Sequence, residues 1–516
     1  MSIPGPSQTP HALSELSLGA LVQSLPVLTS ILLGIVIVVI SFVAMTNRSK
    51  APLANPPRWN QFTLFKRFEF LQNGRAIMSE ARKRYGKHPY RLIVDTGEVL
   101  VLPPAYSVTI RNEMDLSFAK AIEKNFSGHV SGLEPYGLLD HKKKLVQTVV
   151  KKQLTKYLNT VTKPLSEEAT FALNVIFGNA PEWKETLITE SILQLVARLS
   201  TKVFLGDEMC RNGAWLETSK TYTVTSFVLS LKMAAVPEAL KFLHLDEART
   251  ILTPLIAKRK AIKAEARKNG KPEPVYNDMV DWYEQESQGE AYDPAIYQTS
   301  LSLAAIHTTS ELLSHTMTLL ANEPQYVEAL RKEIIHVLRT DGLTKAALAS
   351  LKLVDSTLKE TLRFRPSTYL NMRRHAKKTV VLPDGFVIPK NTQVAVDGFN
   401  MQNPEIYSDP DKFDIYRYYN MRQDPATANK AHLVSTGPDN LSFGHGAQSC
   451  PGRFFAANET KIALCHLLLK YDWELAEGAC LDPKPVFGET TALDRENKLR
   501  FRRRKEEVDL DSLTYV

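Results

Sequence analysis

The chain begins with a long apolar segment and continues as a body in which hydrophobic positions recur with helical spacing. Residues 26–45 (PVLTSILLGIVIVVISFVAM) hold no charged side chain, and a helix of this length crosses the roughly 30 Å hydrocarbon layer of a membrane. Apolar residues three and four positions apart predict long helices over roughly 142–175, 185–205, 294–322, 324–339 and 345–364. The pattern therefore predicts one membrane anchor followed by a mainly helical body.

Shorter stretches of β-branched and alternating residues predict a small β region. Residues 91–102 (RLIVDTGEVLVL) read as two strands around an Asp-Thr-Gly turn. Residues 380–396 read similarly, with turns at Asp-Gly and Lys-Asn. We find no internal repeat that would indicate a solenoid or propeller. We therefore expect a mainly α fold with a small β region, preceded by one N-terminal transmembrane helix.

The charges beside the apolar segment predict how the chain lies in the membrane. The preceding residues carry Glu15 and no Lys or Arg, whereas Arg48 and Lys50 follow the segment. Since basic residues favour the cytosolic side, we expect a single-pass protein of the endoplasmic reticulum membrane. An internal core helix is the alternative for the apolar segment. The expected parts are a short luminal tail (1–25), a transmembrane anchor (26–46), a basic, Pro-rich linker (47–58) and a cytosolic body (59–516).

Composition and charge exclude several classes of protein. Lys plus Arg number 64 and Asp plus Glu 56, so the formal net charge is +8 over 516 residues. Four cysteines in this length exclude a disulfide-rich scaffold. With 44% hydrophobic and 23% charged residues, the chain is not disordered. The basic stretch Lys258–Lys271 contains no aromatic residue on which a base could stack, so we expect a solvated helix and loop and no nucleic-acid partner.

Cys450 lies in the most specific motif of the chain, FGHGAQSCPGR (Phe443–Arg453). A zinc site needs three or four ligands close together, but the other three cysteines show no paired spacing and His445 is the single histidine nearby. Haem iron needs only one protein ligand, and a cysteine thiolate is one known choice. The motif therefore favours haem over zinc.

The residues around Cys450 suit a thiolate ligand. Gly444 and Gly446 allow tight turns and close approach to a flat cofactor. Pro451 is a residue typical of the first position of a helix, and residues 454–470 have the apolar spacing of one. The free N–H groups and dipole at this helix start would stabilise a thiolate and donate hydrogen bonds to its sulfur.

The motif resembles the haem-binding loop of the cytochrome P450 superfamily, Phe-x-x-Gly-x-x-x-Cys-x-Gly, through Phe443, Gly446, Cys450 and Gly452. The resemblance implies that Cys450 is the axial ligand of haem b and that the other three residues form the cofactor-binding loop of a haem-thiolate catalytic domain. The family usually has Arg or His two residues before the cysteine, where it binds a haem propionate. Gln448 stands there; it can donate a hydrogen bond but carries no charge.

Further residues resemble the same family. Glu360 and Arg363, in KETLR, match its Glu-x-x-Arg signature, and Arg417 matches the third member of that group. The resemblance implies a buried ion network that braces the cysteine loop. Arg374 resembles a propionate-binding arginine. The Trp-x-x-x-Arg pair that the family usually has near residues 140–155 is not found.

The predicted helix over 294–322 contains AAIHTT (Ala304–Thr309), which resembles the oxygen-activation pattern Ala/Gly-Gly-x-Asp/Glu-Thr-Thr/Ser. Thr308 matches the threonine and is implied in positioning protons; as the structural alternative, it bonds back to the carbonyl of Ala304. His307 replaces the acid of the pattern and is a candidate proton relay. The alternative for His307 is a hydrogen-bonding or surface-facing role.

The resemblance implies monooxygenation with O2 as co-substrate. The chain has no Gly-x-Gly-x-x-Gly after a strand, so NADPH electrons are expected through a separate NADPH–cytochrome P450 reductase, with cytochrome b5 as an additional candidate donor. The basic excess would favour docking to an acidic partner surface.

The substrate is expected to be apolar, because the anchor places the enzyme at a lipid bilayer. The AAIHTT helix and the C-terminal FRRR strand look like filamentous-fungal biosynthetic members of the family that oxidise terpenoids, which predicts a terpenoid or meroterpenoid substrate. Candidate pocket residues are Ala304, Ile306, Leu370 and Thr490. The alternatives are polyketide, alkaloid or fatty-acid substrates, a haem-thiolate isomerase or dehydratase, a non-catalytic haem- or steroid-binding membrane protein, and a zinc protein.

Overall fold

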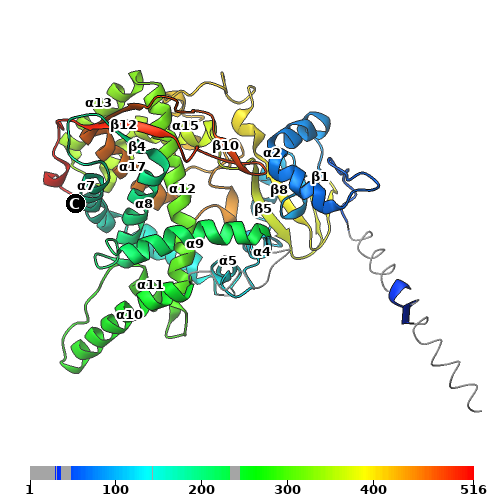
Figure 1. Cartoon of the computed structure of the whole chain (residues 1–516), viewed down its shortest axis with the longest axis horizontal. Coiled ribbons are helices and arrows are strands. Elements are labelled where there is room, and N and C mark those ends of the chain that lie inside the picture. The colour runs from blue at the N-terminus through cyan, green and yellow to red at the C-terminus, as the bar shows by residue number, and fades with distance from the viewer. Residues whose placement is uncertain (1–28, 31, 36–47, 142, 233–244, 516) are drawn as a thin grey trace, which may run out of the picture.

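A large helical part and a smaller sheet part make up the computed structural model, which describes residues 29–30, 32–35, 48–141, 143–232 and 245–515. Helix α12 (Pro294–Asn322) runs through the helical part, and α2 (Thr63–Tyr85) covers the sheet at the other end of the molecule (Figure 1). The remaining helices are α3 (Tyr106–Ile110), α4 (Phe118–Asn125), α5 (Glu134–Gly137), α6 (Leu145–Val149), α7 (Leu158–Phe177), α8 (Ile188–Leu205), α9 (Gly213–Lys232), α10 (Leu245–Lys268), α11 (Met279–Ser287), α13 (Gln325–Asp341), α14 (Lys345–Ser350), α15 (Lys352–Phe364), α16 (Arg417–Met421) and α17 (Arg453–Lys470).

The main sheet has the strand order β1-β2-β8-β5-β3, in which β2 and β8 are parallel and the other neighbours antiparallel. The smaller sheets pair β10 with β11, β6 with β7, and β12 with both β4 and β9. The strands are β1 (Tyr90–Val94), β2 (Gly97–Leu102), β3 (Leu116–Ser117), β4 (Lys184–Leu187), β5 (Leu370–Ala376), β6 (Val380–Val381), β7 (Val387–Ile388), β8 (Gln393–Asp397), β9 (Tyr471–Leu475), β10 (Lys484–Phe487), β11 (Thr490–Ala492) and β12 (Lys498–Arg503).

Most of the expected elements form, with breaks where the backbone leaves the helical region. The hairpin over 91–102 is confirmed as β1–β2, and α12 begins after Asp293, whose side chain accepts the N–H groups of the first turn. The helix expected over 142–175 is interrupted by a π-helical turn and divides into α6 and α7. The helix expected over 345–364 divides at Leu351, where ψ is 75°. Residues 380–396 give the β6–β7 hairpin and most of β8.

The expected linker over 47–58 packs onto the sheet. Arg91 of β1 donates its N–H to the carbonyl of Pro52 at 2.7 Å, and its own carbonyl accepts the N–H of Ala54 at 2.8 Å. Ala51 lies in the hydrophobic core of the sheet. The folded part therefore begins before residue 59, the boundary that composition indicated.

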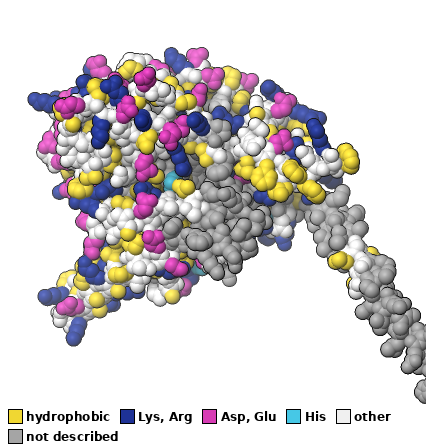
Figure 2. Space-filling model, viewed as in Figure 1, with side chains coloured by type: hydrophobic (Ala, Val, Ile, Leu, Met, Phe, Trp, Pro, Cys, Tyr) yellow, Lys and Arg dark blue, Asp and Glu magenta, His cyan; other side chains and the backbone are white. Residues whose placement is uncertain are grey.

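Within the described residues, no helix is long and apolar enough to cross a membrane. The expected anchor over 26–46 lies outside them except for 29–30 and 32–35, which are helical. The basic stretch Lys258–Lys271 falls largely on α10, where Lys263 pairs with Asp281 and Glu284 of α11. Acidic and basic side chains are interspersed over the face shown in Figure 2.

Candidate active site

The loop before α17 carries Cys450. Gly444 and Gly446 adopt positive φ angles of 68° and 79°, which glycine tolerates without strain. They fold the loop back, so that the N–H of Cys450 donates to the carbonyl of Phe443 at 2.9 Å. Arg453, the first residue of α17, donates from Nη1 to the carbonyl of Cys450 at 2.7 Å. The helix begins two residues after Pro451, slightly later than expected.

The surroundings of the Cys450 thiol act on its pKa in opposite directions. Burial raises the pKa and dominates, while the N–H groups of Gly452 and Arg453 and the Arg453 guanidinium lower it. These donors lie at the N-terminus of an 18-residue helix, where an anion is favoured. The site thus has the donors that a metal-bound thiolate requires.

The cysteine loop is fastened to the segment between α3 and α4. The N–H of Ala447 donates to the carbonyl of Arg111 (3.1 Å) and to the side chain of Asn112 (3.0 Å). A Cβ added at Gly446 would lie 2.3 Å from the Arg111 carbonyl oxygen, so only glycine fits. Sequence reasoning missed Arg111 and Asn112, because nothing in their local pattern indicates a partner more than 300 residues away.

Gln448 has partners other than those expected. Its Oε1 accepts the N–H of Phe118 at 2.7 Å, and its Nε2 donates to the carbonyls of Leu116 (2.8 Å) and Glu113 (3.3 Å). Both amide protons are therefore used by backbone carbonyls, and none is left for a propionate. We correct its role: Gln448 joins the cysteine loop to β3 and α4.

Arg374 is the residue whose surroundings fit an anionic cofactor group. It lies within β5 and is 2% exposed; Nη1 donates to the carbonyl of Arg373, but Nε and Nη2 find no partner among the described residues. Burial lowers the pKa of this guanidinium to about 10. A buried cation with unused donors is costly unless an anion neutralises it. Arg374 and the thiol site of Cys450 together fit a haem with its propionate.

Thr308 and Ala304 are exposed residues in the middle of α12. Thr308 Oγ1 donates to the carbonyls of Ala304 (2.9 Å) and Ala305 (3.4 Å), the back-bonding geometry expected from sequence. Both Thr308 and Ala304 are exposed, whereas Thr309 is buried. A small residue and a hydroxyl, four positions apart, therefore share one accessible face of an otherwise buried helix.

His307 lies on a different face of α12. Its Nε2 is 3.3 Å from the carbonyl oxygen of Lys220 on α9, and since a carbonyl only accepts, Nε2 carries the proton. Burial lowers the pKa of His307 below its usual value, so the neutral ring is favoured. Adjacent helical residues do not face each other. The structure therefore assigns His307 to the contact with α9, and we withdraw it as the candidate proton relay.

Glu360, Arg363 and Arg417 come together in one buried network. Arg363 donates from Nε and Nη2 to the two Glu360 oxygens, both at 2.8 Å, and Arg417 Nε lies 3.1 Å from each oxygen. Arg363 also donates to the carbonyls of Met401 and Pro410. The network thus ties α15 to the chain that leads into α16.

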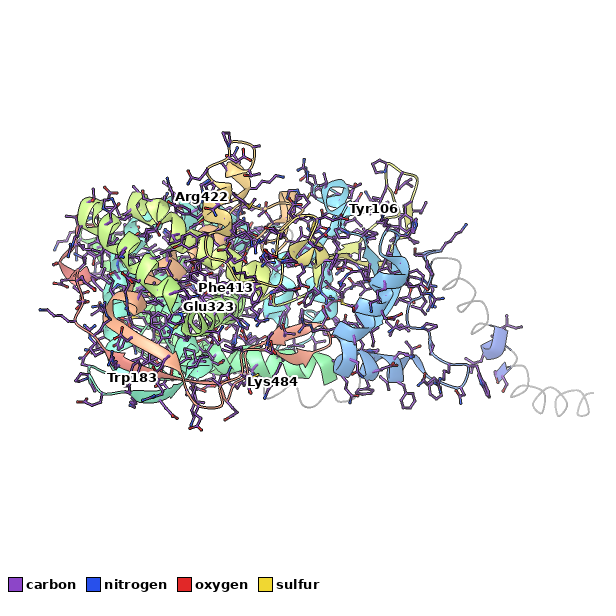
Figure 3. The ribbon with its side chains drawn as sticks, turned by 90° about the horizontal axis from the view of Figure 1, so that it is seen from above. Tyr106, Trp183, Glu323, Phe413, Arg422 and Lys484 are labelled. Carbon is purple, nitrogen blue, oxygen red and sulfur yellow. The ribbon has the colours of Figure 1, made fainter. Side chains whose placement is uncertain are left out.

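A second ion cluster, not expected from sequence, holds the region around Arg453. Asp355 of α15 pairs with Lys461 of α17 and with Arg422, which Figure 3 labels, and accepts the N–H of Leu433. Burial alone would raise the Asp355 pKa, but the Lys461 and Arg422 charges outweigh it and the pKa is lowered. Arg453 Nε donates to the carbonyl of Val434, the residue after Leu433. This second cluster therefore joins α15 and α17 to the chain between α16 and the cysteine loop, and the Leu362 carbonyl of α15 accepts from Ser442, beside that loop, at 3.4 Å.

The four candidate pocket residues separate into two groups. Ala304 is exposed and Thr490, in β11, is partly exposed. Ile306 is fully buried in a cluster with Ala197 and Leu216, and Leu370 is 1% exposed in a core formed with α2 and β1. Ile306 and Leu370 therefore pack among neighbouring core residues, and their place in a substrate pocket stays a prediction.

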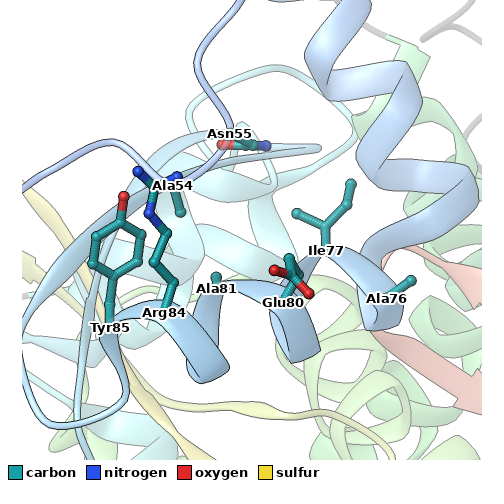
Figure 4. A pocket seen from close by; sticks show the side chains of 8 residues that line it. All are labelled: Ala54, Asn55, Ala76, Ile77, Glu80, Ala81, Arg84 and Tyr85. Atoms are coloured by element: carbon teal, nitrogen blue, oxygen red, sulfur yellow. The ribbon is translucent and has the colours of Figure 1, made fainter.

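A separate pocket lies away from this site. Its volume is about 330 Å³, and it lies between the residues after the apolar segment and one face of α2 (Figure 4). Its lining residues are Ala54, Asn55, Ala76, Ile77, Glu80, Ala81, Arg84 and Tyr85. None of them belongs to α12 or the cysteine loop.

Comparisons with known proteins show the family to which the chain belongs. Residues 56–499 match the family model described as Cytochrome P450. The chain is 40% identical over 462 residues to cytochrome P450 monooxygenase eqxH of Fusarium heterosporum, covering 86% of this chain and 88% of that protein. It is 39% identical over 498 residues to cytochrome P450 monooxygenase hepE of Aspergillus oryzae, covering 92% and 90%.

The fold agrees as well. A crystal structure of the cytochrome P450DA heme domain superposes with a TM-score of 0.64 at 18% identity, covering 88% of this chain and 98% of that one. The expected mainly α fold with a small β region is confirmed. The chain belongs to the cytochrome P450 family and is an oxygen-incorporating oxidoreductase of its monooxygenase kind.

Proposed function

We propose that this protein is a membrane-anchored haem-thiolate monooxygenase that oxidises an apolar terpenoid or meroterpenoid in fungal secondary metabolism. The observation that supports it most is the combination of Cys450, just before α17, with the buried guanidinium of Arg374, whose Nε and Nη2 have no hydrogen-bond partner among the described residues. Haem on Cys450 supplies the activation of O2: one oxygen atom enters a C–H bond of the substrate, the other leaves as water, and NADPH provides the electron pair.

The residues around this site have separable tasks. Thr308 Oγ1 uses its proton on the Ala304 carbonyl and keeps its lone pairs, so it can accept a hydrogen bond from water or another proton donor and hold it in place. The methyl side chain of Ala304 leaves room beside it. The N–H groups after Cys450 stabilise negative charge on its sulfur.

The substrate class rests on the resemblance of the AAIHTT helix and the FRRR strand to terpenoid-oxidising members of the family, and on the expected anchor. The matched proteins from Fusarium and Aspergillus carry the name monooxygenase, and an enzyme held at a bilayer meets apolar molecules. The test is incubation of the full chain with reductase, NADPH and isotopically labelled O2, using terpenoid, polyketide and fatty-acid panels read by mass spectrometry. A labelled terpenoid product is expected. A product without label, formed without NADPH, would instead establish an isomerase or dehydratase.

We further propose an endoplasmic reticulum location, with the catalytic body cytosolic and NADPH–cytochrome P450 reductase, supplemented by cytochrome b5, as electron donor. The apolar residues 26–45 and the basic Arg48 and Lys50 that follow support this topology. The sequons at Asn125 and Asn458 should then stay unglycosylated in cells. A glycosidase-sensitive mobility shift would place the body in the lumen and overturn the proposal.

A further inference from the structure

Glu311 is the single acidic residue of α12. It follows Thr308 by three positions, and residues at this spacing are neighbours on a helix surface, with Cβ atoms about 5–6 Å apart. Between Thr308 and Ala321 every other residue of the helix is buried, whereas the Glu311 side chain is 27% exposed. The accessible face that carries Ala304 and Thr308 therefore continues for one turn and ends at a carboxylate.

The Glu311 carboxylate is held on the side away from Thr308. Its Oε2 is buried and has no aligned hydrogen-bond donor among the described residues. His315, one turn further along α12 and 5% exposed, places Nε2 at 3.2 Å from this oxygen. Buried carboxylate oxygens are usually satisfied by a donor or by ordered water. The carboxylate thus has an ionic neighbour on one side and can accept hydrogen bonds from water on the other.

Charged groups from three parts of the chain border this region. Burial is the main cause that lowers the pKa of His307, and the charges of Arg495, Glu311 and Glu190 act on it as well. Glu190, in α8, and Arg495, after β11, are both exposed. Glu311 therefore lies between a region that solvent reaches and the hydroxyl of Thr308.

The position of Glu311 matters because this chain departs from the family pattern, which has Asp or Glu directly before the threonine. His307 stands there, and its Nε2 lies 3.3 Å from the Lys220 carbonyl oxygen. Adjacent residues lie about 100° apart around a helix, whereas residues three apart differ by about 60°. Glu311 is thus nearer to the face of Thr308 than His307 is.

We propose that Glu311 supplies the proton that Thr308 holds for oxygen activation, an inference that rests on the proposed function. Oxidation of one C–H bond by O2 and NADPH yields an alcohol, water and NADP+, and it consumes one proton from solvent. Glu311 releases a proton to water hydrogen-bonded at the Thr308 hydroxyl, and its carboxylate then takes up another from solvent. Glu311 acts through Thr308 and does not contact the substrate.

The first test needs no substrate. It records the C–O stretching band of carbon monoxide bound to the reduced, haem-loaded full chain, because this band responds to hydrogen bonds and charges beside the gas. Thr308→Ala and Glu311→Gln are each expected to shift the band. A variant with both substitutions should show the band of Thr308→Ala alone, since a group that acts through the hydroxyl has no effect once the hydroxyl is gone.

The second test measures product and peroxide per NADPH, with reductase and the substrate that gives labelled product. Glu311→Gln should lower product per NADPH by about tenfold or more and raise peroxide, because it cannot donate the proton. Glu311→Ala, a second neutral variant, should behave alike. Glu311→Asp keeps the carboxyl group and should recover part of the product and most of the parental band position.

His307→Gln is the matched control, because it changes a titratable residue of the same helix, adjacent to Thr308. It is expected to match the parent in both tests. An equal loss in His307→Gln would return the proton route to that residue and overturn the proposal.

Two further results would overturn it: a parental band and product yield in Glu311→Gln and Glu311→Ala, or effects of Thr308→Ala and Glu311→Gln that add in the double variant. In all these cases the parent still forms its thiolate-type carbon monoxide complex, so the proposed function stands. A parent that forms no such complex would overturn the proposed function itself.

Discussion

Replacing Glu360 with glutamine should destabilise the folded protein and lower its haem content. The carboxylate is fully buried and is the common acceptor for Arg363, at 2.8 Å, and Arg417, at 3.1 Å. Glutamine keeps the shape of the side chain but removes its charge and turns one oxygen into a donor. Two largely buried guanidinium groups then lose their counter-charge.

The magnitude follows from the burial of the network. Removing one partner of a buried ion network costs about 3–5 kcal/mol. Unfolding entropy is about 2 cal/mol/K per residue, or about 1 kcal/mol/K for a body of roughly 450 residues, so the midpoint of thermal unfolding should fall by about 3–5 °C. Because the network ties α15 to the chain before α16, the cysteine loop loses part of its support and haem is retained less well.

The assay is thermal unfolding of the purified chain, monitored by haem absorbance. The carbon monoxide difference spectrum, recorded at equal protein concentration, reports the haem content. Glu328→Gln is the control, since its ion pair with Lys332 on α13 leaves both side chains about three-quarters exposed, and such pairs contribute little. An unfolding midpoint and haem content for Glu360→Gln equal to those of Glu328→Gln would refute the bracing role.

Four further predictions concern single side chains. Cys450→Ala should abolish the thiolate-type carbon monoxide spectrum, and an unchanged spectrum would remove it as the iron ligand. Thr308→Ala should divert NADPH to peroxide at unchanged haem content; product per NADPH equal to that of the parent would contradict its role in holding protons. Arg374→Gln should release haem to apomyoglobin faster, and a parental rate would argue against the propionate contact. Burial raises the pKa of Glu459 to about 8 from an ordinary 4.5, so the folded state keeps a proton that the unfolded chain releases. The contribution of Glu459 to the free energy of unfolding is therefore complete below about pH 4.5 and is lost as the pH rises toward 8. Relative to the parent, Glu459→Gln should be more stable at about pH 8 than at about pH 5. A difference in urea midpoints that does not change with pH would exclude this effect.

The residues that could be predicted from sequence are those whose signal is local. Cys450 stands at fixed spacing from its glycines, Glu360 and Arg363 share a helix face at a spacing of three, and Thr308 bonds back to a carbonyl four residues before it. Helical geometry alone brings such groups together. The long α12 was equally clear, because its cap, its first-turn proline and its apolar run all agree.

The contacts that the sequence did not predict depend on partners far away in the chain. Gln448 was expected at a propionate, but its amide bonds to Phe118, 330 residues earlier. His307 faces α9 because of how two helices pack, which the pattern of one helix does not determine. Leu370 was a pocket candidate through the family resemblance, and its packing in a core with α2 and β1 depends on how the sheet meets that helix.

The engagement of Gln448 with backbone has a consequence for how the enzyme matures. Its three hydrogen bonds join the cysteine loop to β3 and α4 through protein groups alone, so the shape of the loop does not depend on a cofactor group to template it. A newly made chain can therefore complete this part of its fold first and acquire iron-porphyrin afterwards.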